Sequence, residues 1–172
     1  AATVELRQLA LHIRSVGTPA WRRDLSAVLG AEALAILDDE FTSSTNPYRV
    51  KWDPLTSRTG LPLSDTGTHL LNKFSWGIAP SGFYVRNNFV GVPVHQYGAI
   101  IKPVHAKALR FRTRKAATKS NPRGKFNPFQ FRQSVRIPRR QMMPEADTGG
   151  MGNWGPRLNT AADGFLQRTM GW

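Results

Sequence analysis

The sequence predicts an α+β protein, and three observations support this. Apolar residues recur at helical spacing near both ends of the chain, alternating segments flank a tight turn in the middle, and a long basic segment is bounded by extended stretches. We expect N-terminal helices and a C-terminal helix packed on a small antiparallel sheet, with a long basic β-hairpin. A chain of 172 residues can bury one core, so residues 1–172 are predicted to form a single domain.

Two helices are predicted before residue 45. The first follows from a stripe at i, i+3, i+4 and i+7, formed by Leu6, Leu9, Ala10 and Ile13. Gly17-Thr18-Pro19 ends it, and a second helix is expected from about residue 20 to 44. Its core-facing residues are Leu25, Leu29, Ala33, Ile36, Leu37 and Phe41. Glycine costs about 1 kcal/mol relative to alanine in a helix, so Gly30 leaves open a kink or two shorter helices.

The middle of the chain is predicted to contain a loop, a hairpin and one short element. Pro54 makes a helix through the segment after Trp52 unfavourable, and we expect Trp52 to anchor this loop to the core. Residues 74–78 and 83–86 alternate around Pro80-Ser81-Gly82, which predicts two strands joined by a tight turn. Residues 92–97, closed by Gly98, fit either a short helix or a strand end.

Beyond residue 99 the pattern becomes extended and basic. Residues 100–104, 109–112 and 129–137 have the character of strands, and the polar stretch between them carries Gly, Pro and many cations. We expect a projecting basic arm at about 107–128, because a structureless loop of this length inside a compact domain is uncommon. A Gly-rich linker at about 145–156 leads to a C-terminal helix with the apolar residues Leu158, Ala161, Ala162, Phe165 and Leu166.

The charge of the chain is concentrated in one segment. The 79 residues between Asp65 and Glu145 contain no Asp or Glu but hold fifteen of the 24 Lys and Arg. The other 93 residues hold nine bases and eleven acids, so the formal charge of +13 belongs to this segment. A block of one sign repels itself unless an anionic partner lies nearby, which points to nucleic acid or to acidic neighbouring subunits.

The residues that would support an enzyme or a metal site are sparse. There is no cysteine, and the histidines His12, His69, His95 and His105 form no HxxxH or HExxH pair. We interpret Asp38, Asp39 and Glu40 as a solvated face or ring-contact charges rather than a catalytic pair. We therefore expect no catalytic residues, no cofactor and no metal.

Neither a membrane span nor a secretion signal is predicted. No apolar run approaches the roughly 20 residues that cross a bilayer, and the first residues lack the apolar core of a signal peptide. We expect a protein that is made in the cytoplasm and used there or in an assembly built there.

The basic arm holds the best candidates for a contact site. Its cations are Arg110, Arg112, Arg114, Lys115, Lys119, Arg123 and Lys125, with Arg139 and Arg140 as second choices. These cations could track phosphates, pair with an acidic subunit, or remain solvated. The Phe residues among them could stack on bases, or bury one face of the hairpin while Arg solvates the other. No zinc-finger, RNP or helix-turn-helix signature is present, so sequence-specific readout is not predicted.

The order of several short motifs resembles the phage virion morphogenesis family, the tail completion proteins of contractile-tailed, Mu-like phages. The family pattern runs from a Phe and a Trp-x-Pro-Leu, through Leu-x-x-Thr-Gly and a His-Gln-aromatic-Gly, to an Ile-Pro-x-Arg before the last helix. The matching residues are Phe41, Pro47, Trp52, Pro54, Leu55, Thr59, Leu63, Thr66, Gly67, His95, Gln96, Gly98, Ile137, Pro138 and Arg140. The chain departs from the pattern at Val92-Pro93 and after Arg140.

This resemblance implies a structural protein without catalytic activity. It implies a homo-oligomeric ring, commonly of six copies, at the head–tail junction of a virion, where relatives act as tail terminator or neck proteins beside the tube, the sheath or the connector. Double-stranded DNA in the channel is then a further expected partner. The motif residues, such as Trp52, Thr66, Gly67 and Gly98, are expected to serve folding, and we expect His95 to hydrogen-bond a loop backbone.

Two functions from other classes compete with this interpretation. One is a free, sequence-nonspecific nucleic-acid-binding protein, which would be small and would bind DNA with a steep salt dependence. The other is a hydrolase acting on an anionic polymer, which the lack of acids in the basic segment disfavours.

Overall fold

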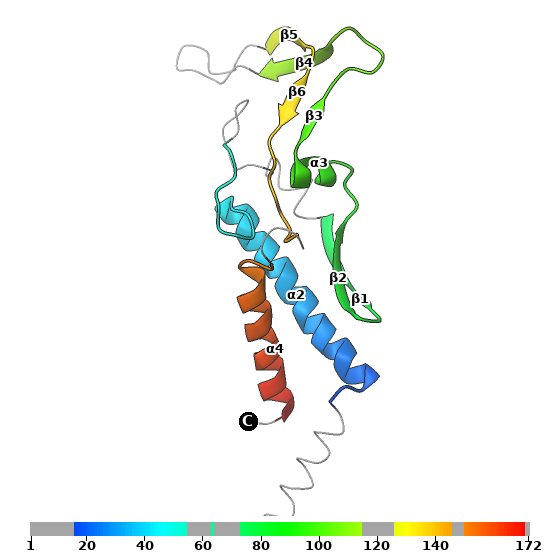
Figure 1. The fold of residues 1–172 in the computed structure, drawn as a ribbon, viewed down its shortest axis with the longest axis vertical. Coiled ribbons are helices and arrows are strands. Elements are labelled where there is room, and N and C mark those ends of the chain that lie inside the picture. Colours follow the sequence, from blue (N-terminus) through cyan, green and yellow to red (C-terminus); the bar gives the residue numbers. More distant parts are fainter. Residues whose placement is uncertain (1–15, 55–62, 64–72, 115–125, 146–149, 171–172) are drawn as a thin grey trace, which may run out of the picture. The chain divides into compact units, whose positions relative to one another are not determined.

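The computed structural model describes residues 16–54, 63, 73–114, 126–145 and 150–170 (Figure 1). It confirms the α+β class, with helices toward both ends and small antiparallel sheets between them. In chain order the elements are α2 (Pro19–Ser43), β1 (Phe74–Ala79), β2 (Gly82–Asn87), α3 (Val92–Tyr97), β3 (Ala99–Ile101), β4 (Leu109–Arg114), β5 (Phe126–Arg132), β6 (Val135–Ile137) and α4 (Trp154–Met170). The helix expected around residues 6–13 lies outside the described residues.

The chain divides into two compact units. Unit 1 consists of Ala1–Asp39, Lys73–Asn88 and Pro144–Trp172, and unit 2 of Glu40–Asn72 and Phe89–Met143. Instead of the one small sheet that the sequence suggested, the described strands form three two-stranded sheets, β1–β2, β3–β6 and β4–β5. The first sheet belongs to unit 1 and the other two to unit 2.

Helix α2 is one continuous helix, which resolves the alternative left open at Gly30. Its start follows from local chemistry, because the Thr18 hydroxyl accepts a hydrogen bond from the Trp21 amide at 3.2 Å. Pro19 then occupies the first helical position, where a missing N–H costs nothing. Of the predicted stripe, Ala33, Ile36, Leu37 and Phe41 are buried.

Helix α4 lies alongside α2 in unit 1 and runs antiparallel to it (Figure 1). Near the end of α4, the Phe165 ring meets Trp21 at the start of α2, with centroids 5.7 Å apart and an interplanar angle of 61°. Near the start of α4, Arg157 contacts Glu32 farther along α2. Of the apolar residues predicted for this helix, Leu158 is buried, whereas Ala161, Ala162, Phe165 and Leu166 are half-buried. Trp154, at the start of α4, is buried as well.

The hairpin β1–β2 is the tight hairpin that the sequence predicted. It pairs Phe74 with Asn87 at one end and Ala79 with Gly82 at the other, across a two-residue turn. The Trp76 ring of β1 lies against Gly30 of α2, where an added Cβ would come within 2.5 Å of the ring. Gly30 therefore serves close approach of hairpin to helix rather than a kink.

A groove of about 840 Å³ lies beside this contact, between the first half of α2 and the β1–β2 turn. Leu25 and Leu29 line it together with Ile78, and Arg22 and Arg23 stand among its lining residues. These two leucines, predicted to face the core, are therefore only half-buried.

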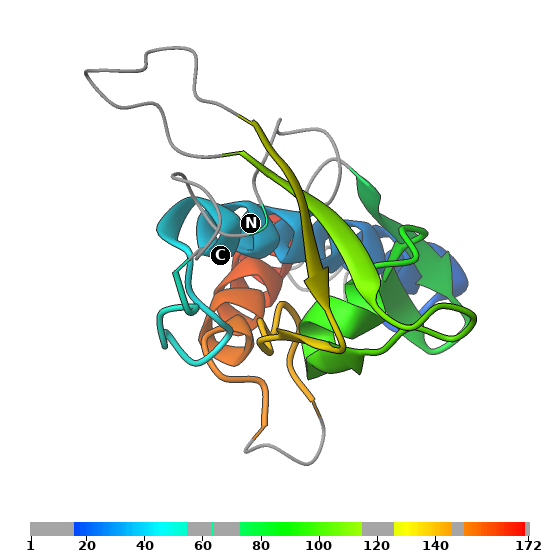
Figure 2. The same cartoon turned by 90° about the horizontal axis from the view of Figure 1, so that it is seen from above.

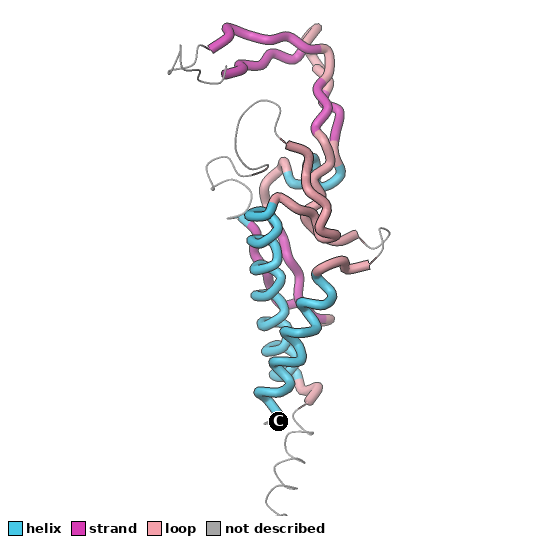
Figure 3. The backbone as a smooth tube through the Cα atoms, turned by 90° about the vertical axis from the view of Figure 1, so that its left-hand side faces the viewer, coloured by secondary structure: helices cyan, strands magenta, loops and turns pink. Residues whose placement is uncertain are grey.

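Unit 2 contains two antiparallel ribbons, and in the sequence β4–β5 is nested between the two strands of β3–β6. Residues Ala99, Ile100 and Ile101 pair with Ile137, Arg136 and Val135. Strands β4 and β5 lie side by side in the view from above (Figure 2), and Figure 3 shows the strands of both ribbons in magenta. Of the alternatives for residues 92–97, the structure selects a short helix, which ends at Gly98.

We expect Gly30→Leu to destabilise the protein by about 1–3 kcal/mol, because the new side chain would displace the Trp76 ring from the helix. Ala31→Leu, at the exposed neighbouring position, is the matched control and should leave the melting temperature nearly unchanged. Thermal denaturation followed by circular dichroism measures both. Equal melting temperatures for the two variants would contradict the close contact.

Candidate interaction surface

The two units differ sharply in charge. Unit 2 holds sixteen Lys and Arg against three Asp and Glu, whereas unit 1 holds eight of each. The formal charge of +13 therefore belongs entirely to unit 2. A protein surface with this asymmetry attracts an anionic partner to one unit only.

The predicted arm begins on strand β4. Arg110, Arg112 and Arg114 occupy every second position of that strand, and Arg110 is exposed. A basic hairpin was predicted here, and β4 and β5 pair antiparallel from Leu109 with Arg132 to Arg114 with Phe126. Four further predicted contact residues lie outside the described residues: Lys115, Lys119, Arg123 and Lys125.

The register of the ribbons places each paired arginine opposite an apolar residue. Arg110 pairs with Phe131, Arg132 with Leu109, Arg136 with Ile100 and Arg114 with Phe126. Like charges placed directly opposite each other destabilise a sheet. This register avoids such pairs, so the ribbons accommodate their cations without any carboxylate in strands β3 to β6.

A bulge in β5 shifts the pairing of β4 and β5 beyond Phe111. Phe111 pairs with Gln130 and Thr113 with Asn127, so Pro128 and Phe129 together oppose Arg112. Proline cannot donate a hydrogen bond to the ladder, and inside sheets it is largely confined to edges and bulges. Pro128 thus accounts for the irregularity and for the shift that brings Arg114 opposite Phe126.

Unit 2 also exposes large apolar side chains. Phe131 is 66% exposed, Ile100 is 63% exposed and Val104 is 84% exposed, and Val90 and Tyr97 are exposed as well. Phe131 and Ile100 stand opposite Arg110 and Arg136 in the ladders, so cationic and apolar groups share the same faces. Arginine beside aromatic and aliphatic groups is typical of the centre of a protein interface.

The foundation of this surface is a hydrogen-bonded clamp around Gln96. Its Oε1 accepts hydrogen bonds from the Met142 amide at 2.8 Å and the Met143 amide at 3.2 Å. Its Nε2 donates to the Met143 carbonyl at 2.9 Å. These hydrogen bonds tie the segment after β6 to helix α3 inside unit 2. They are shielded from water, because Gln96 is only 3% exposed. The sequence placed Gln96 in a motif but gave no sign that it has this role.

Three residues predicted from the motif complete the clamp. The His95 carbonyl accepts a hydrogen bond from the Arg140 amide at 2.7 Å, and Arg140 Nη2 donates to the Asp53 carbonyl at 3.2 Å. Arg140 is 5% exposed and so is not on the surface, unlike the exposed Arg139. Gly98 has φ +74°, and an added Cβ would lie 3.1 Å from the Arg139 amide, so glycine is required there.

Trp52 joins the loop after α2 to the same clamp. Its indole N–H donates to the Gln141 carbonyl at 3.0 Å, and its ring meets Phe41 edge-on at 5.4 Å. Pro54 is exposed just beyond it, and Pro138 is half-buried between β6 and the clamp. Four motif residues lie outside the described residues: Leu55, Thr59, Thr66 and Gly67.

His95 is half-buried, and its surroundings disfavour the protonated ring. Burial lowers its pKa from the ordinary value of 6.5, and the positive charge of Arg140 lowers it further. The side-chain Nδ1 has no hydrogen-bond partner among the described residues. The backbone carbonyl of His95 makes the loop contact instead.

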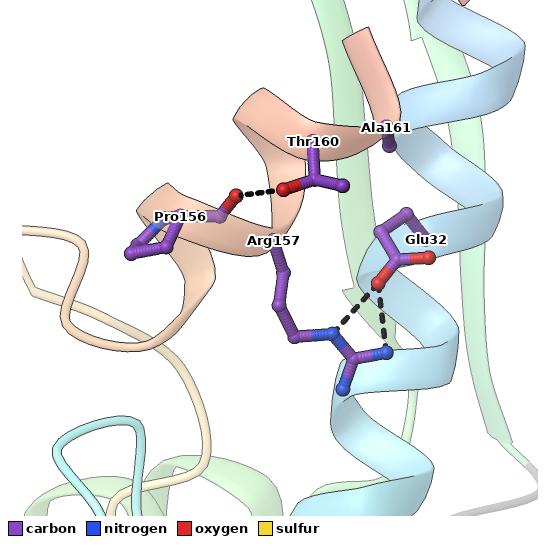
Figure 4. Close-up of a pocket in the computed structure, with 5 residues that line it drawn as sticks. All are labelled: Glu32, Pro156, Arg157, Thr160 and Ala161. Atoms are coloured by element: carbon purple, nitrogen blue, oxygen red, sulfur yellow. Dashed lines mark hydrogen bonds and ion pairs between the residues drawn. The ribbon is translucent and has the colours of Figure 1, made fainter. Parts of the chain in front are cut away.

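A hollow of about 290 Å³ in unit 1 is built around an ion-pair network (Figure 4). Arg157 Nε and Nη2 both lie 2.7 Å from Glu32 Oε1, and Arg157 also contacts Asp39. The acidic run expected to form one surface is thus divided, because Asp38 is exposed, Asp39 binds Arg157 and Glu40 is buried. This arginine therefore links α4 to α2 by ion pairs.

The described residues also bear on two other kinds of site, a metal centre and a membrane span. No group of three or more His, Asp or Glu side chains among them could hold a metal ion. None of their helices is both long and apolar enough to span a bilayer.

Comparison of the chain with protein-family models, with curated proteins and with solved structures finds no match.

We expect Gln96→Leu to lower the free energy of unfolding by about 1–3 kcal/mol for each backbone group left buried without a partner. Gln96→Glu retains an acceptor for the two amides and should lose less. Gln133→Leu at an exposed position is the control. Urea denaturation measures all three, and a Gln96→Leu variant as stable as Gln133→Leu would exclude the clamp.

The lowered pKa of His95 predicts a pH-dependent stability. As pH falls below about 6.5, the unfolded chain takes up this proton before the folded chain does, so stability is full above that value and decreases below it. His95→Gln cannot titrate, so its melting temperature should approach or exceed that of the wild type as the pH falls. Calorimetry across this range, with exposed His105→Gln as control, measures the effect. A pH-independent difference between His95→Gln and wild type would contradict it.

Proposed function

We propose that this chain is a structural virion protein that forms a ring at the head–tail junction of a phage. In this role, as tail terminator, tail completion or neck protein, it joins the tail tube or sheath to the connector. The carrying observation is that unit 2 combines exposed Phe131, Ile100 and Val104 with a net positive charge. Apolar patches of this kind commonly mark sites of assembly.

The motif order supports the same role. The residues that match the tail completion pattern include Trp52, His95, Gly98 and Arg140, and these four meet around one buried clamp. Motif residues that meet in a scaffold, away from the surface, fit a protein whose task is to hold a shape. The proposal therefore includes no catalytic step and no cofactor.

The ribbons provide a means of joining subunits. In the described part of the chain, β3–β6 and β4–β5 each consist of two strands, so each strand has one ladder partner there. A two-stranded ribbon is rarely stable alone and gains stability when a neighbour covers its apolar face or pairs with its edge. A head-to-tail contact of this sort closes into a ring when its rotation permits.

A free, sequence-nonspecific nucleic-acid-binding protein is the alternative. The same cations favour it, because phosphate contacts need only positive charge. Exposed Ile100, Val104 and Val90 do not contribute to phosphate binding, whereas a subunit interface would bury them. The apolar groups therefore favour the assembly.

Light scattering coupled to size-exclusion chromatography tests this proposal. We expect the wild type to form a closed oligomer, and the double variant Ile100→Ser/Phe131→Ser to dissociate toward monomers because its apolar contact area is lost. The control, Ile78→Ser/Tyr84→Ser, removes similarly exposed apolar groups from unit 1 and should remain oligomeric. A wild-type protein that stays monomeric at high concentration would contradict the proposed ring assembly.

A further inference from the structure

We propose that the two basic ribbons of unit 2 bind the phosphate backbone of duplex DNA without reading its sequence. This inference deepens the proposed function. It rests on that function only for the source of the DNA, because a head–tail junction surrounds the path of the genome. The sequence left open whether the cations meet DNA or an acidic subunit, and the charge distribution favours DNA.

The first step is that unit 2 cannot neutralise itself. Strands β3 to β6 contain no carboxylate, and the three acids of unit 2 are Glu40, Asp53 and Asp65. Glu40 is 4% exposed, and the charge of Asp53 acts on the buried Arg140. Of the two acids that the structure describes, neither belongs to strands β3 to β6, so these two carboxylates cannot balance the sixteen bases of unit 2.

The second step is that more copies of the chain do not supply the missing charge. Unit 1 carries eight bases and eight acids, and Arg157 already engages Glu32 and Asp39. Every added subunit brings another +13. Assembly therefore increases self-repulsion, and the counter-charge has to come from outside the chain.

Duplex DNA fits this requirement better than an acidic protein. It carries one negative charge per about 1.7 Å of its axis, so any cation along a ribbon finds a phosphate within reach. An acidic protein would need carboxylates matched to separate arginines on two ribbons. The exposed cations of the segment continue from β3 to the clamp: Lys102, Lys107, Arg110, Arg132, Arg136 and Arg139.

The geometry suits a backbone contact. A two-stranded antiparallel ribbon fits the major groove, which is about 12 Å wide. Alternate residues of a strand are about 6.6 Å apart, which is the spacing of the Arg110, Arg112 and Arg114 positions along β4. Arg132 and Arg136, which the sequence did not single out, are exposed, and each pairs in register with an apolar residue, Leu109 or Ile100.

The test measures binding of a fluorescein-labelled duplex of mixed sequence by anisotropy over a range of NaCl concentrations. We expect Arg132→Ala/Arg136→Ala to weaken binding and to reduce the slope of log K against log salt by about 1.8, corresponding to two lost phosphate contacts. Arg22→Ala/Arg23→Ala removes the same charge from exposed positions of unit 1 and should keep the wild-type slope. Melting temperatures establish that both variants are folded.

The outcomes separate this proposal from the ring. No binding of the duplex at low salt, or equal loss in the two double variants, overturns the DNA contact, whatever the oligomeric state. An oligomer that dissociates in Arg132→Ala/Arg136→Ala while duplex binding is unchanged would assign these arginines to a protein neighbour and also overturn it. If the protein is a monomer and binds the duplex with the predicted salt slopes, the proposed DNA contact stands and the proposed ring is contradicted.

Discussion

Repulsion between like charges is the main constraint on the structure of unit 2. Its strands must pair while carrying arginines and no carboxylate, so no ion pair within the ladders can relieve like charges. The register reduces this repulsion, because it places Arg110, Arg132 and Arg136 opposite apolar residues. The same register leaves Phe131 and Ile100 exposed beside cations, so the solution to repulsion creates a surface that favours a partner.

The clamp around Gln96 holds the chain that follows β6 in one position relative to helix α3. Gln96 replaces a missing strand partner for the segment after β6, since its amide group satisfies two amides and one carbonyl of that segment. Trp52 and Arg140 attach the loop after α2 to the same point. Buried polar groups are costly unless paired, so these hydrogen bonds select one position for the chain rather than merely adding stability.

Much of the local structure could be predicted because its causes are local. The stripe of α2, the turn between β1 and β2 and the apolar pattern of α4 depend on residues a few positions apart. Gly30 shows the limit of such reasoning. In the sequence it weakens a helix, whereas in the structure it admits the Trp76 ring, which comes from a strand more than forty residues later.

The sequence alone determined the α+β class, the basic hairpin and the position of the charge, because composition and periodicity are properties of the chain itself. The tertiary structure decided which groups carry the surface. Arg140 is buried although it was a candidate contact, Gln96 became the centre of a clamp, and Arg132 and Arg136 joined the exposed cations. Burial and hydrogen-bond partners depend on residues brought together from distant parts of the chain, so they cannot be predicted from a local sequence pattern.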